Sequence, residues 1–96
     1  MSKIEILKSL KEHFPLLQKR YMVDGLYLFG SYARDEHTAF SDVDLLVEFS
    51  KTPDLLTFIE LEEILSKYLN KNVDLVPKRK LKSELKNRIL EEAIAV

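Results

Sequence analysis

The sequence predicts a small α/β domain, in which helices pack against a sheet of three to four strands. Its 96 residues suit one domain, because domains usually contain about 100–150 residues. Segments with apolar residues at helical spacing alternate along the chain with short apolar segments typical of strands. A composition of 46% hydrophobic and 32% charged residues excludes collagen-like and low-complexity chains and argues against disorder. Residues 1–96 are therefore expected to form a single domain.

The N-terminal part is predicted to contain two helices and the first strand. Residues 2–13 have helical spacing, and Ser2 with Glu5 has the pattern of a capping box. Proline is favourable at the first position of a helix, so a second short helix is expected over residues 15–21. Residues 26–29 form a short apolar run typical of a buried strand.

The following segments are predicted as a turn, a strand, a helix, a strand and a helix. Ser31 is expected to cap one helical turn over residues 32–34, before a polar loop. Residues 42–49 alternate in polarity, as a strand does. Thr52 and Pro53 are favourable N-cap and first residues for a helix that ends at Leu69. The last two predicted elements are a strand over residues 72–76 and a helix over residues 81–95.

The composition excludes several classes of protein. Without Cys, there is no disulfide, thiolate metal site or cysteine nucleophile. The charged start lacks the apolar run of a signal peptide, and no apolar run reaches the roughly 18–20 residues of a membrane span, so a cytoplasmic protein is expected. A net charge of −1 argues against stable binding of nucleic acid, for which a strongly basic domain is typical.

The charges are unevenly distributed. Residues 35–63 hold nine acids and one base, and residues 78–88 hold six bases and one acid. Such runs are usually solvated faces of helices. The alternative is that part of the acidic run collects cations and that the basic run meets an anionic partner.

Three carboxylates form the first part of a candidate site. Asp42 and Asp44 lie two apart on a predicted strand, so their side chains share a face and repel each other. If the next strand is a neighbour, Asp74 adds a third carboxylate to that face. Oxygen ligands at this spacing suit Mg²⁺ or Mn²⁺, and a pair of ions about 3.5–4 Å apart can hold both attacking and leaving oxygens.

Gly30 and Ser31 form the second part of the candidate site. A strand that ends in Gly-Ser before a helical turn leaves backbone N–H groups and a hydroxyl free to donate to phosphate oxygens. Arg34 follows on the same turn, where it either contacts the phosphates or covers the surface. Asp42 lies shortly after this bend, so one local unit would hold a triphosphate and its metal.

These motifs resemble those of a known family. The segments GSYAR (residues 30–34) and SDVDLLV (residues 41–47) are similar to the signature of the DNA polymerase β-type nucleotidyltransferase superfamily. More narrowly, the chain resembles the minimal nucleotidyltransferase (MNT) domains, the antitoxins of HEPN–MNT toxin–antitoxin pairs. The resemblance extends over nearly the whole chain, with VDLV (residues 73–76) at the place of the third carboxylate. It implies a small mixed sheet flanked by helices.

The resemblance also implies roles for the residues of the bend. Gly30 and Ser31 would hold the β- and γ-phosphates of a nucleoside triphosphate, with ATP as the implied substrate, and Arg34 would contact a phosphate. The family often has Gly after the Ala-Arg pair, where this chain has Asp35. That departure changes the flexibility of the loop and adds a negative charge near the triphosphate.

For the acids, the resemblance implies metal binding and catalysis. Asp42 and Asp44 would bind two Mg²⁺ ions, with Mn²⁺ as an alternative, and Asp74 would complete the metal site and help to deprotonate the attacking hydroxyl. The hydroxyl would attack the α-phosphorus, and pyrophosphate would leave. Neither histidine is needed: we expect His13 at the surface near a helix end and His37 in a solvated loop.

The implied acceptor is a tyrosine of a cognate HEPN ribonuclease toxin, which AMP attachment silences. The basic segment 78–82 and the closing helix are candidates for docking this partner, in a homo- or hetero-oligomer. One alternative is a binding module that neutralises the toxin by covering it. Another is a nucleotidyltransferase for a small molecule such as an aminoglycoside, although such enzymes usually carry an added substrate-binding domain.

Overall fold

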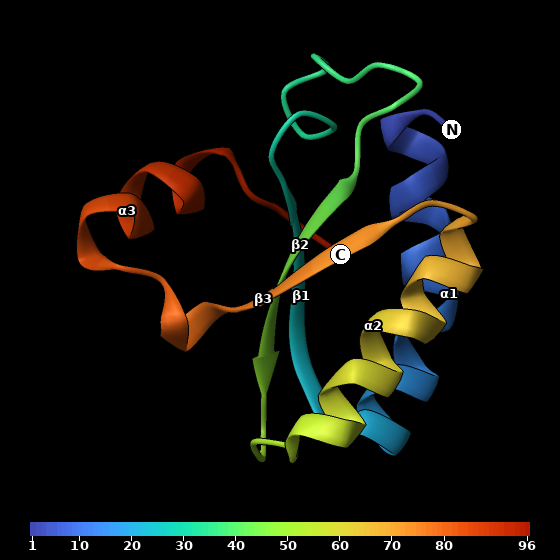
Figure 1. Ribbon diagram of the computed structural model, residues 1–96, viewed down its shortest axis with the longest axis vertical. Helices are drawn as coiled ribbons and strands as arrows, with labels where there is room; N and C mark the ends of the chain where they lie inside the picture. Colours follow the sequence, from blue (N-terminus) through green and yellow to red (C-terminus); the bar gives the residue numbers. More distant parts are fainter.

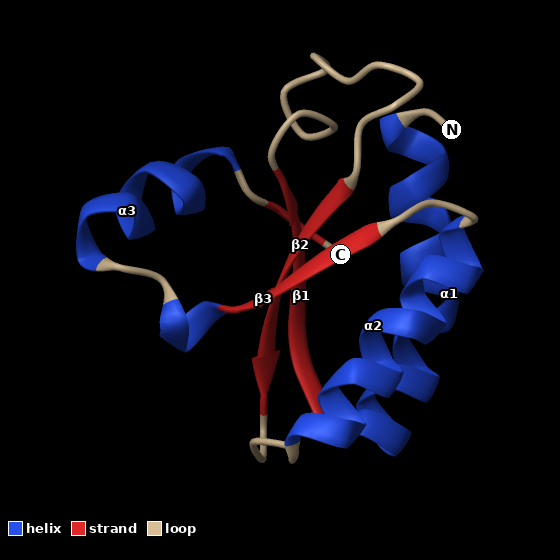
Figure 2. Ribbon diagram, viewed as in Figure 1, coloured by secondary structure: helices blue, strands red, loops and turns tan.

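The computed structural model describes residues 1–96 and contains a four-stranded sheet with helices on both sides (Figures 1 and 2). The elements are α1 (Lys3–Tyr21), β1 (Val23–Phe29), β2 (Val43–Phe49), α2 (Leu55–Leu69), β3 (Val73–Pro77), η1 (Lys78–Lys80), α3 (Ser83–Glu92) and β4 (Ile94–Ala95). Helices α1 and α2 lie along one face of the sheet, and α3 stands on the other side. The α/β prediction is confirmed. No helix is both long and apolar enough to cross a membrane.

The sheet has the strand order β3-β2-β1-β4. Strand β1 is antiparallel to both β2 and β4, whereas β2 and β3 are parallel. The sheet is therefore mixed, as the resemblance implied. A parallel pair needs a crossover connection, and α2 provides it between β2 and β3.

Helix α1 is continuous, so the prediction of two helices divided at Pro15 is wrong. Ser2 caps the helix and forms the predicted capping box with Glu5. Pro15 lies inside the helix, where it removes one backbone donor from the hydrogen-bond ladder. The buried residues of α1 nevertheless keep one stripe across this position: Ile6, Leu10, Leu17 and Tyr21. Packing of this stripe stabilises the helix more than the proline weakens it.

Two predicted boundaries also need correction. Strand β1 begins at Val23, earlier than predicted, and runs through Gly25 beside a register shift. Glycine inside a strand often marks such a bulge. Helix α2 is capped by Asp54 instead of Thr52, because the Asp54 carboxylate accepts a hydrogen bond of 2.8 Å from the Thr57 N–H.

The C-terminal segment is a short helix and a strand, which corrects the prediction of one helix over residues 81–95. Helix α3 ends at Glu92, and β4 then pairs with β1, with Ala95 opposite Tyr27. The Val96 N–H donates to the Leu26 carbonyl at 2.9 Å. A strand of two residues is too short to produce a periodic pattern, so the sequence did not indicate it.

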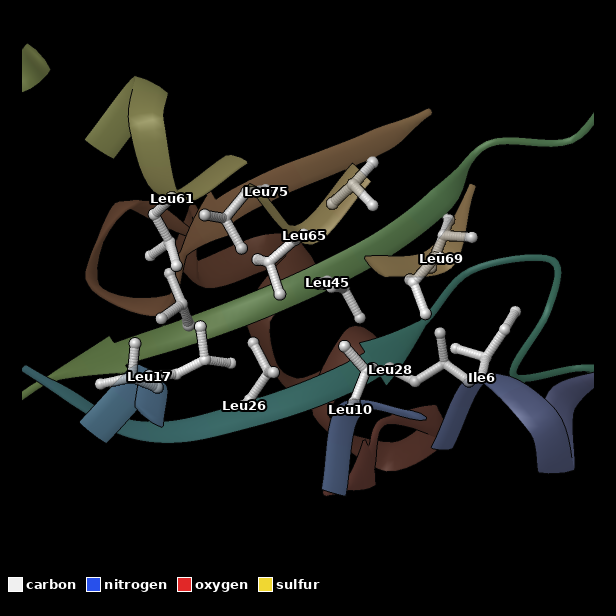
Figure 3. Packing of buried hydrophobic residues seen from close by; sticks show 14 of the residues in the cluster. Ile6, Leu10, Leu17, Leu26, Leu28, Leu45, Leu61, Leu65, Leu69 and Leu75 are labelled. Atoms are coloured by element: carbon white, nitrogen blue, oxygen red, sulfur yellow. The ribbon is translucent and has the colours of Figure 1, made fainter. Parts of the chain in front are cut away.

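The core lies between the sheet and helices α1 and α2 (Figure 3). In β2, Val43, Leu45 and Val47 point into it, as the alternation predicted. Its sixteen buried members are Ile6, Leu10, Leu17, Tyr21, Val23, Leu26, Leu28, Tyr32, Val43, Leu45, Val47, Leu61, Leu65, Leu69, Val73 and Leu75. The other face of β2, which includes Asp44, is thereby left for the functional site.

Candidate active site

The three predicted carboxylates lie where β2 and β3 begin. Asp44 and Asp74 are direct partners in the parallel β2–β3 pair, and side chains of directly paired residues share a face of the sheet. Asp42 comes just before β2, and alternation places it on the same side as Asp44. This face is opposite the core, because the intervening Val43 and Leu45 are buried against the helices. We call Asp42, Asp44 and Asp74 the site acids.

The charge of Asp44 is unfavourable in its surroundings. Burial raises the pKa of the Asp44 carboxyl, and the negative charges of Asp74 and Asp42 raise it further. The positive charge of Arg34 acts in the opposite direction. A cation held among these acids would relieve the repulsion between them.

The site acids have the donor chemistry of a divalent metal site in an open arrangement. Hydrogen bonds and ion pairs engage other acids of the chain but not these three. No three acid or histidine side chains are close enough together to enclose one ion. Like charges repel, so an open arrangement is expected for the chain by itself. Carboxylate oxygens are the ligands that Mg²⁺ and Mn²⁺ prefer.

Gly30 brings the bend after β1 into contact with the site acids. Its φ of +76° is in the left-handed region, which favours glycine. A Cβ atom on Gly30 would overlap the carboxylate of Asp44. Glycine is therefore required both for the turn and for this close approach, and the bend lies beside the acids as predicted.

Residues 31–35 form a hydrogen-bonded turn, in agreement with the predicted single helical turn. The Arg34 N–H donates to the Gly30 carbonyl at 3.2 Å. The N–H groups of residues 31–33 donate to no backbone carbonyl. Successive unpaired N–H groups in a turn can form a site for anions, and phosphate binding at this bend stays a prediction.

A cavity of about 760 Å³ separates this turn from α3. Its lining comprises Phe29, Gly30, Ser31, Arg34, Glu36, Asp44, Leu85, Arg88, Ile89 and Glu92. The volume falls in the range of roughly 300–1,000 Å³ typical of ligand sites. Four of the six predicted site residues line it, whereas Asp42 and Asp74 do not. Sequence reasoning did not single out Arg88 and Glu92.

Arg34 lies between two acids. Its Nε donates to Glu36 Oε2 at 3.0 Å, and its Nη1 donates to Glu92 Oε2 at 3.0 Å. These hydrogen bonds, with Glu92 contributing most, raise the pKa of Arg34. The Gly30 N–H also donates to Glu92 Oε1, at 3.2 Å. A contact across 62 positions leaves no signal in local sequence patterns.

A bend with free N–H groups beside paired carboxylates is an arrangement suited to nucleotidyl transfer. Residues 3–96 match the model of the nucleotidyltransferase domain family. The chain belongs to this family. The predicted resemblance and the predicted enzyme class are both confirmed.

This nucleotidyltransferase is similar to named relatives and to solved structures. It is 46% identical over 92 residues to protein adenylyltransferase MntA of Thermococcus cleftensis, covering 96% of this chain and 93% of the relative. A solved structure assigned to the minimal nucleotidyltransferases is 35% identical, with a TM-score of 0.83 and coverage of 100% of this chain and 97% of the other.

Two further solved structures similar to this nucleotidyltransferase are toxin–antitoxin complexes. One, with AMP-PNP, has a TM-score of 0.70 and 27% identity and covers 99% of this chain and 72% of the other. The other is a tri-AMPylated HEPN toxin of Shewanella oneidensis with an MNT antitoxin. It has a TM-score of 0.61 and 27% identity and covers 97% of this chain and 66% of the other.

Asp35 has a conformation that explains why glycine suits this position of a nucleotidyltransferase. Its φ is +58°, a left-handed value that Asp tolerates better than most residues. Its carboxylate pairs with Lys3 Nζ at 2.8 Å. The added charge is thus directed to the start of α1 and is partly neutralised there.

Neither histidine of this nucleotidyltransferase joins the site acids, but both predicted environments need correction. His13 lies in the middle of α1, since the helix does not end there; its Nδ1 is 2.7 Å from the Ser9 carbonyl, and its ring stacks on Tyr68. His37 stacks on the buried Tyr32 and is only partly exposed, whereas a solvated residue was expected.

The acidic run is largely engaged in contacts within the chain, whereas most bases of the basic run have no ion-pair partner. Six of the nine acids of residues 35–63 have hydrogen-bond partners: Asp35, Glu36, Glu48, Asp54, Glu60 and Glu62. In the basic run, Lys78 pairs with Glu48 at 3.2 Å. Lys78, Arg79 and Lys86 also line a cavity of about 320 Å³ at the far ends of β2 and β3. Partner docking by this run stays a prediction.

Proposed function

We propose that this nucleotidyltransferase transfers AMP from ATP to a tyrosine hydroxyl of a cognate HEPN ribonuclease toxin and thereby acts as its antitoxin. The observation that supports this most strongly is the pairing of Asp44 with Asp74 beside the Gly30 bend. The relative named protein adenylyltransferase and the similar complex with a tri-AMPylated HEPN toxin support the reaction and the partner.

The bend at Gly30 and Ser31 is the proposed binding site of the triphosphate. The N–H groups of residues 31–33 have no backbone acceptor, and Gly30 allows a close approach. We assign the β- and γ-phosphates to Gly30 and Ser31, and a further phosphate contact to Arg34, which lines the same cavity. A similar structure that contains AMP-PNP supports a nucleoside triphosphate as the ligand.

The site acids are the proposed metal ligands. Asp42, Asp44 and Asp74 would hold two Mg²⁺ ions, because all three are oxygen donors and their mutual repulsion favours a bound cation. Bound Mg²⁺ would neutralise phosphate charge and lower the pKa of a hydroxyl.

In the proposed reaction, the tyrosine oxygen forms a bond to the α-phosphorus of ATP. The bond between that phosphorus and the oxygen bridging to the β-phosphate breaks, and pyrophosphate leaves. Asp74 is exposed at the edge of the site and is the proposed acceptor of the hydroxyl proton. The other groups position the phosphates and balance their charge, which is the main contribution of protein to such transfers.

The product explains how the transfer would silence the toxin. An adenylyl group adds bulk and negative charge beside a site that binds RNA, and both hinder entry of the RNA. The cavity between the bend and α3 is open enough to admit a protein side chain.

The test is incubation of the chain with ATP labelled at the α-phosphate, Mg²⁺ and the purified cognate HEPN protein. We expect label on the toxin, and Asp42→Asn with Asp44→Asn should reduce the labelling rate by about 100-fold or more. Glu63→Gln is the matched control, because Glu63 is an exposed acid on α2, across the sheet from the site acids.

Two outcomes would contradict the proposal. Equal labelling by the double variant would show that the site acids are not catalytic. A toxin that is inhibited by the chain but never labelled would indicate the alternative of a binding module.

A further inference from the structure

The carboxylate of Glu92 occupies the part of the bend at which the triphosphate is expected. It accepts a hydrogen bond from the Gly30 N–H at 3.2 Å and two from Arg34 Nη1, at 3.0 and 3.2 Å. Gly30 and Arg34 are two of the residues assigned above to phosphates. A carboxylate and a phosphate accept from backbone N–H and guanidinium groups in the same way, so Glu92 and the nucleotide compete for the same hydrogen bonds.

Glu92 is held at this place by the chain that follows it. It is the last residue of α3, and β4 pairs with β1 directly afterwards, with Ile94 opposite Leu28. The side chain of Glu92 is 24% exposed, so it faces protein more than solvent. It also adds negative charge near Asp44, where the site already contains three acids.

Helix α3 has few other attachments. None of its residues is buried, and Leu85 is 47% exposed. The helix stands away from the sheet (Figure 1). The C-terminal end of α3 is therefore held by β4 and by the hydrogen bonds of Glu92, and the rest of the helix has little buried contact.

We propose that Glu92 is an internal competitor of the triphosphate, and that nucleotide binding displaces its carboxylate and loosens α3, while β4 stays paired with β1. This inference rests on the proposed function, since it assumes that the nucleotide binds at the bend. By linkage, whatever stabilises α3 in its present place weakens nucleotide binding by the same factor.

The test compares Glu92→Gln with Glu91→Gln for binding of AMP-PNP with Mg²⁺, measured by titration calorimetry. Glu91 is the matched control, because it is adjacent on α3 and exposed, and its substitution removes the same charge. Glutamine at position 92 keeps the shape but removes the anion. We expect binding about three- to tenfold tighter for Glu92→Gln and nearly unchanged binding for Glu91→Gln.

A second measurement detects the movement of α3. Hydrogen–deuterium exchange of residues 83–92 should increase when AMP-PNP binds to the parent chain, and should already be high in free Glu92→Gln. A merely structural role for Glu92 would weaken nucleotide binding in the variant, and a general charge effect would act equally at position 91.

Each outcome decides the inference. Equal affinities for the two variants, weaker binding by Glu92→Gln, or unchanged exchange in α3 would overturn it, while AMP transfer by the parent would leave the proposed function intact. Absence of AMP-PNP binding to the parent and to both variants would overturn the inference and the proposed function together. Binding by Glu92→Gln alone would support both.

Discussion

Gly30 packs directly against the carboxylate of Asp44, so the bend and the acidic end of the sheet are in contact. Gly30→Ala places a methyl group into that carboxylate and requires a left-handed conformation of Ala. We expect a loss of about 1–3 kcal/mol in the free energy of unfolding and at least about tenfold slower AMP transfer. Denaturant titration and the labelling assay measure the two effects.

Gly25→Ala is the control for this substitution. A Cβ atom at Gly25 would come within 3.0 Å of Glu48 Oε1 and within 3.1 and 3.2 Å of the hydroxyl and ring of Tyr27, and neither residue is one of the site acids. Transfer by Gly25→Ala should stay near that of the parent. Equal rates for Gly30→Ala and the parent would show that the contact with Asp44 has no functional role.

The repulsion among the site acids predicts that Asp44→Asn stabilises the chain in the absence of divalent ions. The pKa of Asp44 is raised by burial and by Asp74 and Asp42, so its anionic form is disfavoured in the folded state at neutral pH. The melting temperature of the variant should exceed that of the parent in EDTA. Added Mg²⁺ should raise the melting temperature of the parent more than that of the variant. A melting temperature of Asp44→Asn below that of the parent in EDTA would contradict this prediction.

The pKa of Glu48 is shifted in the opposite direction from that of Asp44, and this shift predicts how the stability of the chain depends on pH. The hydrogen bond from Tyr27 and the neighbouring Lys78 lower the pKa of Glu48. Since the folded pKa lies below the unfolded one, the stability that Glu48 provides is present above about pH 4.3 and is lost as the pH falls through the lowered value. Glu48→Gln should therefore be less stable than the parent near neutral pH. The difference should disappear in acid, as thermal melts at several pH values would show. A difference that is constant across pH would contradict the assignment.

The left-handed conformation of Asp35 predicts different effects of two small replacements. Asp35→Ala should lower the free energy of unfolding by about 1 kcal/mol, because a Cβ atom without a compensating polar group is unfavourable there. Asp35→Gly should change it by less than about 0.5 kcal/mol, because relief of the conformation offsets the lost pair with Lys3. Denaturant titrations of both variants test the order. Both variants lose the pair with Lys3, so equal losses of stability would show that the charge matters and the backbone conformation does not.

The position of Pro15 inside α1 leads us to expect that replacing it with Ala raises the free energy of unfolding. It lies in the interior of α1 and is exposed, so Pro15→Ala restores a backbone donor without disturbing the core. We expect a gain of about 1–2 kcal/mol, since the helical benefit is partly offset by the greater freedom of the unfolded chain. Circular dichroism melts measure it, with the exposed Gln18→Ala as control. No gain would indicate that α1 is divided at Pro15 in solution.

Much of the site was predictable, because it depends on short-range regularities. Alternation along β2 places Asp42 and Asp44 on one face and the apolar residues on the other, and the same rule applies to Asp74. Gly30 and Ser31 were recognisable because a glycine at the end of an apolar strand often marks a close approach of the backbone to a ligand. The proximity of the bend and the acids followed from the strands being neighbours, which the register confirms.

The errors have a different physical origin, since they concern interactions between distant segments. Pro15 is compatible with α1 only because the stripe on either side of it packs on the sheet, and local propensity does not contain that energy. Strand β4 forms because the edge of β1 has free backbone groups with which residues 94 and 95 pair. The contacts of Glu92 with Gly30 and Arg34 depend on where α3 ends relative to β1, which no periodicity reports.

The pairing of β2 with β3 has a consequence for how reliably the chain assembles. Sliding β3 by one residue would turn Asp74 inward beneath α2 and expose Val73 and Leu75, because neighbouring side chains alternate between faces. A lone carboxylate in that apolar layer is strongly penalised. A shifted register is therefore much less stable than the native one. The stable register is the one that places Asp44 and Asp74 side by side.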